Sequence, residues 1–478
     1  MPHQVLELHR VSARCFDLAG TRTGSIRDQL LRSGVIVQAL ADEGLIGPQR
    51  PLLVCGAGAA GMNAAMVAAR RGVEVLVLER GPDPFHVINS IFRRVDPTEY
   101  DWPHTHWKTA RFPVARALGH AHVALRQLRP VYASVLVSAW RGRWQTFQQR
   151  SRQTPGAARV DLRIGVDASE LICRDPGTGH QVDVTGRFMP NSMKRELKSF
   201  GAVLSCVGHG EERVGEATPQ GNWNGYVGLQ FWRDRDGIHP GMSLPAGISR
   251  VVVSGGGDGA MQDIQRILTS YCGRQLYARL ERAGAAPEPE MLLALLSAEE
   301  SARRQTCWIP NGQRKHDAAL LWHWSFENLI EAQVRKLAAA PGLVDHVVDK
   351  LFRNVDTDRR PELWWVYEQA GPGHAYALNR YLVLLLIRLA QEKFGASSPI
   401  SVLPGSRIKR ITPSGAHACG VPFVCLGQAH EVQIDGHNPL LLQDIDMIVV
   451  RHGIEPSHAI LNQRLPVPEQ LSPFDIPH

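Results

Sequence analysis

The stretch from Pro51 to Arg80 restricts the fold of this chain more than any other part of the sequence. It opens with an apolar run at 52–55 that is long enough for a buried strand. Residues 59–71 are rich in alanine and methionine and contain no proline, so they predict a helix. A second run of valine and leucine follows at 75–78. This succession predicts a parallel strand–helix–strand unit of about thirty residues.

Three glycines stand between the first predicted strand and the helix, at the G-x-G-x-x-G spacing. Gly56 permits a tight turn, Gly58 lets a pyrophosphate approach the backbone, and Gly61 lets the helix pack closely on the strand. The helix N-terminus presents N–H groups and a positive dipole end to phosphates. Glu79, at the end of the second strand, can accept hydrogen bonds from an adenosine ribose. We therefore predict a dinucleotide site; the alternative is a Rossmann-like unit that has lost its ligand. The predicted contacts are Gly56, Ala57, Gly58, Ala60, Gly61, Glu79 and Arg80.

A second turn of this kind begins after the strand-like run at 250–254, and a helical run follows it at 261–283. Its spacing is G-x-G-x-x-A, and no strand ending in an acid or an arginine follows the helix promptly. The turn either contacts a second nucleotide or flavin, or is a tight strand-to-helix turn kept for packing. Asp258 either bonds a ribose or flavin hydroxyl or caps the helix. The predicted contacts here are Gly255, Gly257, Asp258, Gly259 and Ala260.

The order of predicted elements after the two turns is the same. Alternating, strand-like segments occupy 159–185 and 401–432. A buried strand follows each group, at 200–207 and at 445–451. This repetition predicts an α/β fold with two Rossmann-like nucleotide-binding lobes, β-meanders and a helical insertion. The glycines that follow the two closing strands complete the predicted cofactor contacts: Gly208 and Gly453.

A chain of 478 residues exceeds what one hydrophobic core normally supports, so several segments are expected. We place an N-terminal helical extension at 1–48, a dinucleotide-binding lobe at 49–248, and a second lobe at 249–455. The second lobe carries the helical insertion at about 285–395, and a tail follows at 456–478.

The composition is that of an ordinary globular protein, with 44% hydrophobic and 21% charged residues. The eight cysteines form no C-x-x-C pair, and no metal site is predicted. No secretory signal is visible, and the longest apolar run, 382–387, is too short to span a bilayer. We expect a cytoplasmic protein without a membrane partner.

The net charge of the chain is +7, and its excess of basic residues lies mainly in one segment, since residues 102–160 contain no Asp or Glu. Ten basic residues lie in the part 108–159, which could attract a cofactor phosphate, an acidic partner or carrier, or nucleic acid. The alternative is a solvated basic helix face.

Histidines and tryptophans supply the candidates for chemistry. His209, His104 and His323 could act as acid–base or substrate-orienting groups. His104 falls in an aromatic loop after the second strand, which is otherwise a surface loop anchored by its tryptophans. The paired Trp364 and Trp365 either line an aromatic substrate pocket or are core anchors.

The chain resembles the flavoproteins with two dinucleotide-binding domains, the glutathione-reductase structural class, which includes flavin monooxygenases. The resemblance covers most of residues 50–455. It rests on the first glycine turn with Glu79, the closing strand at 207–210, the second turn at 255–260 and the strand at 446–453.

The resemblance implies FAD at the first turn and NAD(P)H near the second. The sequence departs from the pattern of this class in three ways. The chain has no redox-active cysteine pair, which argues against a disulfide reductase, no late Gly-Asp segment for the flavin ribityl chain, and no F-x-G-x-x-x-H pattern.

The leading hypothesis is an FAD-dependent oxidoreductase linked to NAD(P)H, for instance a monooxygenase acting on a small or aromatic substrate, and it could form a homo-oligomer. The alternatives are a nucleotide-binding sensor that contacts an acidic partner and an FAD-dependent oxidase that never uses nicotinamide.

Overall fold

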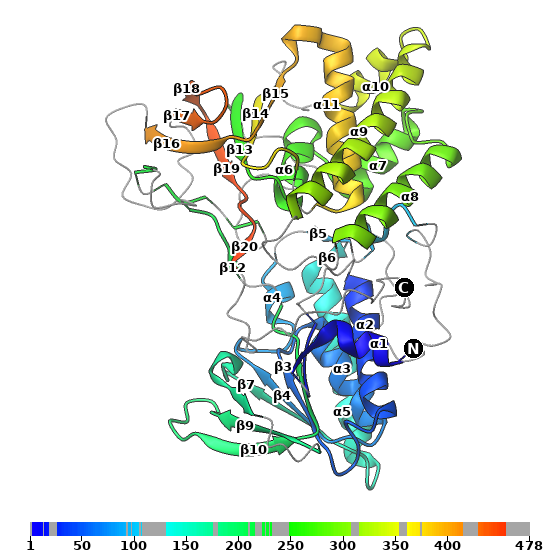
Figure 1. Cartoon of the computed structure of the whole chain (residues 1–478), viewed down its shortest axis with the longest axis vertical. Coiled ribbons are helices and arrows are strands. Elements are labelled where there is room, and N and C mark those ends of the chain that lie inside the picture. The colour runs from blue at the N-terminus through cyan, green and yellow to red at the C-terminus, as the bar shows by residue number, and fades with distance from the viewer. Residues whose placement is uncertain are drawn as a thin grey trace. The chain divides into compact units, whose positions relative to one another are not determined.

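The computed structural model describes residues 2–12, 14–18, 26–91, 94–96, 98–104, 107, 131–174, 180–208, 211–215, 222–224, 226–228, 230–231, 248–306, 315–352, 361–372, 375–413 and 429–455. Residue contacts divide the chain into two compact units (Figure 1). Unit 1 draws on Met1–Asp101, Thr105–Glu211 and Glu455–His478, and unit 2 on Trp102–His104 and Glu212–Ile454. Each unit has its own parallel sheet.

Unit 1 is built on a six-stranded sheet in the order β1-β2-β11-β3-β4-β7. All neighbouring strands run parallel except β1, which is antiparallel to β2. Leu53 of β3 lies between Leu76 and Val203 of the two neighbouring strands. A strand with parallel neighbours on both sides is buried on both faces, which explains why the run 52–55 carries no charged residue. The strands are β1 (Arg10–Ser12), β2 (Cys15–Asp17), β3 (Leu52–Cys55), β4 (Val75–Glu79), β7 (Val160–Ile164) and β11 (Ala202–Ser205).

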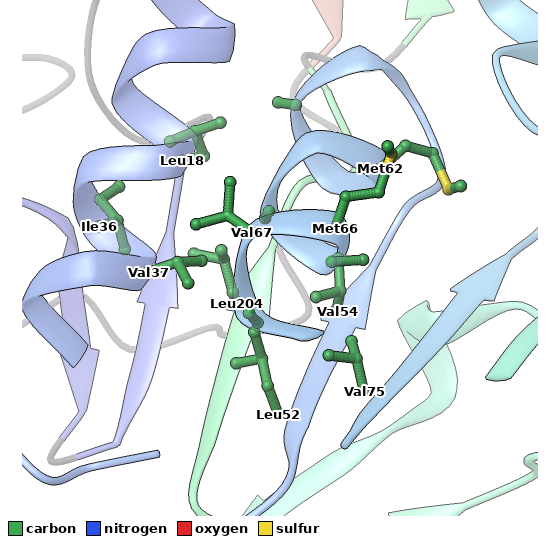
Figure 2. Packing of buried hydrophobic residues seen from close by; sticks show 14 of the residues in the cluster. Leu18, Ile36, Val37, Leu52, Val54, Met62, Met66, Val67, Val75 and Leu204 are labelled. Atoms are coloured by element: carbon green, nitrogen blue, oxygen red, sulfur yellow. The ribbon is translucent and has the colours of Figure 1, made fainter. Parts of the chain in front are cut away.

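Helices cover one face of this sheet and a small antiparallel meander covers the other. Leu52 and Val54 point into the core beneath the helices, as Figure 2 shows. Leu53 and Cys55 point to the opposite face and pack against the meander. The helices of unit 1 are α1 (Pro2–His9), α2 (Ile26–Asp42), α3 (Ala59–Arg70), α4 (His86–Asn89) and α5 (Ala133–Gln153). The meander has the order β10-β9-β8, and its strands are β8 (Ile172–Arg174), β9 (Val182–Gly186) and β10 (Glu196–Phe200).

The helix α2 packs on α3 and joins it through a buried polar contact. The Asn63 side-chain amide donates to the Leu30 carbonyl oxygen at 2.8 Å and to the Ser33 hydroxyl at 3.1 Å. Because Asn63 is fully buried, these bonds satisfy a group that would otherwise be costly to bury. The N-terminal residues therefore belong to the same core as the first glycine turn.

Unit 2 has a four-stranded parallel sheet in the order β15-β14-β13-β19, with a second meander, β16-β17-β18, on one face. Inward side chains of the meander, such as Ile408, Val432 and Ile434, pack with Val252 and Ile448 of the sheet. The strands are β13 (Arg250–Ser254), β14 (Glu362–Tyr367), β15 (Ile400–Pro404), β16 (Arg407–Pro413), β17 (His430–Asp435), β18 (Leu440–Ile445) and β19 (Met447–Val450).

The two units share one order of elements, as the sequence predicts. In unit 1 the chain runs through β3, α3, β4, α5, β7, three meander strands and β11. In unit 2 it runs through β13, α6 (Asp258–Thr269), β14, α11 (Ala377–Phe394), β15, three meander strands and β19. The sheet orders β7-β4-β3-β11 and β15-β14-β13-β19 are therefore equivalent. The predicted α/β fold with two Rossmann-like lobes is confirmed.

The units differ in the connection between the first helix and the second strand. In unit 1 a turn at 71–74 makes this connection, whereas unit 2 inserts further helices between α6 and β14. The inserted helices are α7 (Gly273–Arg282), α8 (Pro289–Thr306), α9 (Lys315–Ala338) and α10 (Leu343–Leu351). α11 lies within the expected 285–395 insertion, but here it is the crossover helix between β14 and β15.

The remaining elements are short. Strands β5 and β6 pair with each other, and β12 and β20 lie where the chain passes from one unit to the other. Their bounds are β5 (Arg94–Val95), β6 (Val131–Tyr132), β12 (Glu211–Glu212) and β20 (Ile454–Glu455). Of the helices in the described ranges, none combines the length and apolar character needed to cross a membrane. The predicted tail at 456–478 lies outside the described residues.

Candidate functional site

The first glycine turn has the backbone geometry that its sequence predicts. Gly56 has a φ of +99°, a conformation that side-chain-bearing residues rarely adopt. Its N–H donates to the Leu78 carbonyl oxygen at 2.7 Å, which holds the turn against β4. A Cβ on Gly61 would overlap the Gly56 carbonyl oxygen, so only glycine allows α3 to approach β3 this closely. Gly56 and Gly61 are therefore needed by the fold itself.

Gly58 differs from these two glycines because a Cβ built on it meets nothing within 4 Å. It is the N-cap residue of α3, in an extended conformation, and no side chain caps the helix there. The first turn of α3 carries no acidic residue. An open space next to uncapped N–H groups at the positive end of a helix fits a diphosphate.

Glu79 closes the other side of this turn. One carboxylate oxygen accepts a hydrogen bond from the Ala57 N–H at 2.7 Å, and the other accepts from the Gly81 N–H at 2.6 Å. These bonds fix the carboxylate at the carboxyl end of β4. A carboxylate has about four acceptor positions, so ribose hydroxyls could still donate to it.

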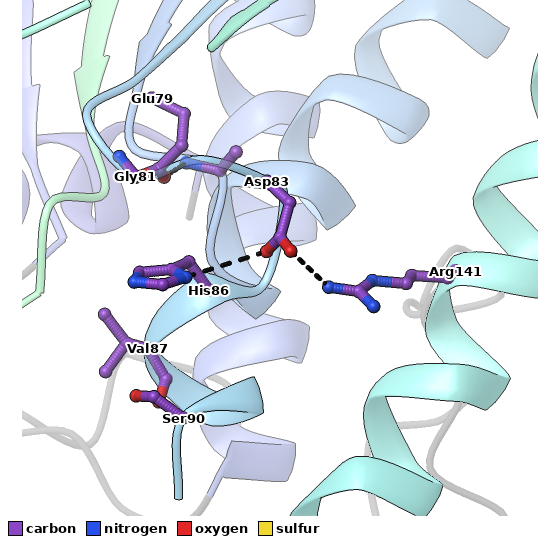
Figure 3. Close-up of polar contacts among 8 residues, drawn as sticks. Glu79, Gly81, Asp83, His86, Val87, Ser90 and Arg141 are labelled. Atoms are coloured by element: carbon purple, nitrogen blue, oxygen red, sulfur yellow. Dashed lines mark hydrogen bonds and ion pairs between the residues drawn. The ribbon is translucent and has the colours of Figure 1, made fainter. Parts of the chain in front are cut away.

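The loop after β4 is held to α5 by a carboxylate, as Figure 3 shows. Asp83 pairs with Arg141 at 2.7 Å, and His86 lies 3.8 Å from the same carboxyl group. Phe85 anchors the loop in the core, with its ring 5.3 Å from that of Trp140. The segment beside the first turn is thus fixed by a charge pair and an aromatic pair.

The second turn repeats the backbone of the first. Gly255 has a φ of +129°, and its N–H donates to the Val366 carbonyl oxygen at 2.8 Å. A Cβ on Gly255 would overlap the Arg451 carbonyl oxygen. Gly257 is the uncapped N-cap residue of α6, and a Cβ on it meets nothing within 4 Å. Ala260, at the third motif position, is fully buried.

Asp258 serves the packing of two helices. One of its carboxylate oxygens accepts from the Tyr376 N–H at 2.7 Å and from the Asn379 side chain at 3.1 Å. Tyr376 is the N-cap residue of α11, so Asp258 accepts from a backbone N–H group at the start of that helix. The N-cap residue of α6 is Gly257. The contacts of Asp258 resemble the predicted capping role more than the predicted ribose or flavin contact. The helix that it caps is α11, however, and not its own helix α6.

The strand β14 shows what replaces the ribose-binding acid in unit 2. Cys55 pairs with Leu78 in unit 1 and Ser254 pairs with Val366 in unit 2, so Tyr367 occupies the position of Glu79. Tyr367 is buried, and burial raises the pKa of its phenol above the ordinary value, so the group is neutral. This equivalence is hidden in the sequence because the helical insertion separates β14 from α6.

The tryptophans of β14 belong to the core. Trp365 is fully buried, and its indole N–H donates to the Gly255 carbonyl oxygen at 2.7 Å. Its ring lies 4.7 Å from that of Tyr367. Trp364 is partly buried beneath the Arg250 guanidinium, 5.1 Å from the ring. Of the two alternatives, these contacts favour core anchors over a substrate pocket.

A serine and a histidine meet beside the second turn, at the carboxyl ends of β13 and β19. The Ser254 hydroxyl lies 2.8 Å from the Nε2 atom of His452. Burial, followed by the Arg213 cation, lowers the pKa of His452 to about 4, so its imidazole is neutral at pH 7. The Trp223 ring packs edge-on against it at 5.6 Å. The sequence motif 446–453 contains His452, but the serine partner becomes visible only in the sheet.

The predicted acid–base histidines have separate surroundings. His209 lies outside the described residues. His104 is partly exposed and groups with unit 2. His323, on α9, is 8% exposed, and burial with the Arg380 and Arg388 cations lowers its pKa to about 3. A base this weak is poorly matched to proton transfer near neutral pH. The catalytic roles of these three histidines stay predictions.

The other predicted contacts lie around the two turns. Ala57 and Ala60 are buried at the first turn, and Arg80 is exposed after β4. A Cβ on Gly259 would lie 3.3 Å from the Arg451 side chain. The closing glycines occupy equivalent positions with similar φ values: Gly208 (+80°) and Gly453 (+85°).

The described residues contain no group of three or more His, Cys, Asp and Glu side chains arranged to hold a metal ion. Five cysteines fall in the described ranges, and all of them are free: Cys15, Cys55, Cys173, Cys206 and Cys272.

Comparisons with known proteins agree with this geometry. Residues 54–119 match the family model described as an NAD(P)-binding Rossmann-like domain. The match covers the first glycine turn, α3 and β4. The predicted dinucleotide-binding class of this lobe is therefore confirmed. No curated protein matches the sequence.

Several solved structures are similar in fold. Bacillithiol disulfide reductase Bdr from Bacillus cereus has 12% identity and a TM-score of 0.40, with 86% of this chain and 80% of that chain covered. Thioredoxin reductase from Lactococcus lactis has 12% identity and a TM-score of 0.36, with coverages of 85% and 78%. A cyclohexanone monooxygenase mutant from Rhodococcus sp. Phi1, bound to NADP+, has 12% identity and a TM-score of 0.38, with coverages of 86% and 73%.

Proposed function

We propose that this protein is an FAD-dependent oxidoreductase that takes electrons from NAD(P)H. The observation that carries the proposal is the repetition of one site in two lobes of equivalent topology. Each lobe places an open glycine, Gly58 or Gly257, at the uncapped N-terminus of a twelve-residue helix. Two such turns in one chain suit an enzyme that binds two adenine dinucleotides.

FAD is assigned to unit 1 because that lobe retains every part of the fingerprint. The uncapped α3 N-terminus would hold the diphosphate, and Glu79 would receive the adenosine ribose. When bound, the flavin supplies the electron-transfer chemistry, and the protein supplies binding and orientation. Glu79 is already positioned for its part by the Ala57 and Gly81 N–H groups.

NAD(P)H is assigned to unit 2, where Gly257 opens the second turn. The buried Tyr367 phenol replaces the acid, so this lobe would hold the ribose less tightly than unit 1 does. Weaker binding suits a coenzyme that must leave after each turnover. His452 and Ser254 lie beside the turn as neutral hydrogen-bonding groups. We propose a small or aromatic molecule as the substrate, and oxygenation as the reaction that uses the electrons.

An FAD-dependent oxidase is the second candidate, and two features of the second turn favour it. Asp258 is engaged by α11, and Tyr367 stands where a ribose-binding acid would lie. If these features exclude a nucleotide, the second lobe is a packing scaffold. The organic substrate would then supply the two electrons that reduce a bound flavin, and molecular oxygen would accept them.

The test begins with the purified protein. We expect yellow material that releases FAD on denaturation, identified by chromatography and mass spectrometry, and that bleaches on anaerobic addition of NADPH or NADH. Yellow protein that neither nicotinamide bleaches would support the oxidase. Colourless protein that binds NAD(H) without turnover would overturn both candidates and favour a nucleotide sensor.

A further inference from the structure

A cavity of about 560 Å³ lies in unit 1, between the C-terminal parts of α3 and α5. Its volume is in the range of small-molecule sites. The α3 side contributes Met66 and Arg70, and the α5 side contributes Arg143, Phe147 and Arg150. Since α3 rises about 1.5 Å per residue, Met66 and Arg70 lie roughly 12 and 18 Å along the helix from Gly58. The cavity is therefore separate from the proposed FAD site.

The cavity combines positive charge with apolar surface. Three arginines line it, and none of its described lining residues is acidic. Within the described ranges, no salt bridge involves Arg70 or Arg150. Burial, followed by the Arg150 cation, lowers the pKa of Arg70, as expected where two like charges are held together. An anion between these two side chains would relieve their repulsion.

Arginines near helix C-termini can also be explained by their attraction to the negative end of the helix dipole. Arg70 and Arg150 are in the last turns of α3 and α5, where cations offset the negative end of the helix dipole. Two helix ends carry about −1 charge in total, against about +2 from Arg70 and Arg150 alone. The carbonyl oxygens of Ala68 and Ala69, near the end of α3, accept from the backbone N–H groups of residues 71–73. Capping and dipole effects therefore leave a positive cavity.

Two other arginines of α5 do not line the cavity. Arg141 is paired with Asp83 and does not line the cavity (Figure 3). Arg152 is exposed and does not line it either. The hydroxyl groups of Thr146, Ser151 and Thr154 also line the wall, but each donates its hydrogen to a backbone carbonyl oxygen, so the arginines are the donors left for an anion. The Phe147 ring, stacked on Trp144 at 5.7 Å, supplies a fixed aromatic surface.

From this arrangement we propose that the cavity is a second binding site, for a small organic phosphate that carries an aromatic or apolar group. Its phosphate lies between Arg70 and Arg150, whose guanidinium groups match phosphate oxygens geometrically. Its apolar part contacts Met66 and Phe147. The proposal is independent of the reaction assigned to the two glycine turns.

The test uses the purified protein with FAD and NADPH added in excess, so that phenyl phosphate cannot occupy a nucleotide site at either glycine turn. Phenyl phosphate is the probe, and its binding is followed by isothermal titration calorimetry. We expect saturable binding that is at least roughly tenfold tighter than that of inorganic phosphate or of phenol, because each control lacks one half of the recognition. Binding should weaken as ionic strength rises from about 50 to 300 mM.

The variants Arg70→Ala and Arg150→Ala should each weaken phenyl phosphate binding by roughly tenfold or more. The matched control is Arg152→Ala, on the same helix but outside the cavity, which should change binding by no more than about twofold. All three substitutions are at exposed positions, and circular dichroism verifies the fold. Absence of binding, retention of affinity in Arg70→Ala/Arg150→Ala, or equal affinity for inorganic phosphate would each overturn the proposal.

Discussion

At the scale of single residues, the glycines of the first turn have two separate roles. Gly61→Ala should destabilise the fold by about 2–4 kcal/mol, because the added methyl group overlaps the Gly56 carbonyl oxygen. Gly58→Ala should cost no more than about 1 kcal/mol, because its methyl group meets no protein atom. Urea denaturation of the two variants measures the difference, and equal destabilisation would show that the open space at Gly58 is not present in solution.

The buried His323 should make the free energy of unfolding depend on pH between about 6.5 and 3. Its folded pKa of about 3 lies below the ordinary 6.5, so the unfolded chain binds the proton more readily. Stability is thus fully present above pH 6.5 and falls by a few kcal/mol as the pH drops toward 3. The charged groups around His323 are Glu327, Arg380 and Arg388.

The variant His323→Gln removes the titrating imidazole and leaves Glu327 in place. Its free energy of unfolding, measured at several pH values, should depend less steeply on pH between 6.5 and 4 than that of the parent protein. Parallel curves for the two proteins would mean that His323 is accessible to solvent in the folded state.

The sequence predicts the residues of the first turn well because the whole unit lies within thirty consecutive positions. Glycine spacing, helix and Glu79 can all be compared with known geometry in one stretch. Tyr367 could not be predicted, since its position depends on a strand pairing across the inserted helices. The contact between Ser254 and His452 is hidden for the same reason, because β13 and β19 are neighbours only in the sheet.

At the scale of elements, one carboxylate joins α6 to α11. Asp258→Ala should lower the free energy of unfolding by about 1–2 kcal/mol, because the start of α11 loses its acceptor. Asp258→Asn retains a side-chain oxygen and should restore most of that stability. Thermal unfolding and NAD(P)H titration of both variants distinguish the possible roles. A weaker NAD(P)H affinity with unchanged stability would instead indicate contact with the ribose.

The predicted elements differ in how strongly the sequence marks them. The buried strands β3, β11 and β13 are evident because continuous apolar runs end at glycine. The strands β1 and β2 have three residues each and are too short for any periodicity to appear. Their place at the sheet edge follows from pairing with β11 rather than from their own sequence.

At the scale of the whole molecule, the repeated topology predicts two coenzymes per chain that can be lost separately. Gly58→Val should remove FAD, because its side chain fills the space at the α3 N-terminus, while the second turn stays intact. Gly257→Val should leave FAD bound at one per chain but abolish bleaching by NAD(P)H. The cofactor content of the denatured protein and anaerobic spectra report the two effects.

The matched control for both variants is Gly142→Val, at an exposed glycine on α5 where a Cβ also meets nothing within 4 Å. It should leave helix stability unchanged or raise it by less than about 1 kcal/mol, because valine has a higher helix propensity than glycine, and it should keep both the yellow colour and the bleaching. If Gly257→Val bleaches like the parent protein, then NAD(P)H does not use the second turn, and the equivalence of the two lobes is one of fold alone. If Gly58→Val retains FAD at full occupancy, the flavin lies elsewhere, and the assignment of unit 1 fails while that of unit 2 still stands.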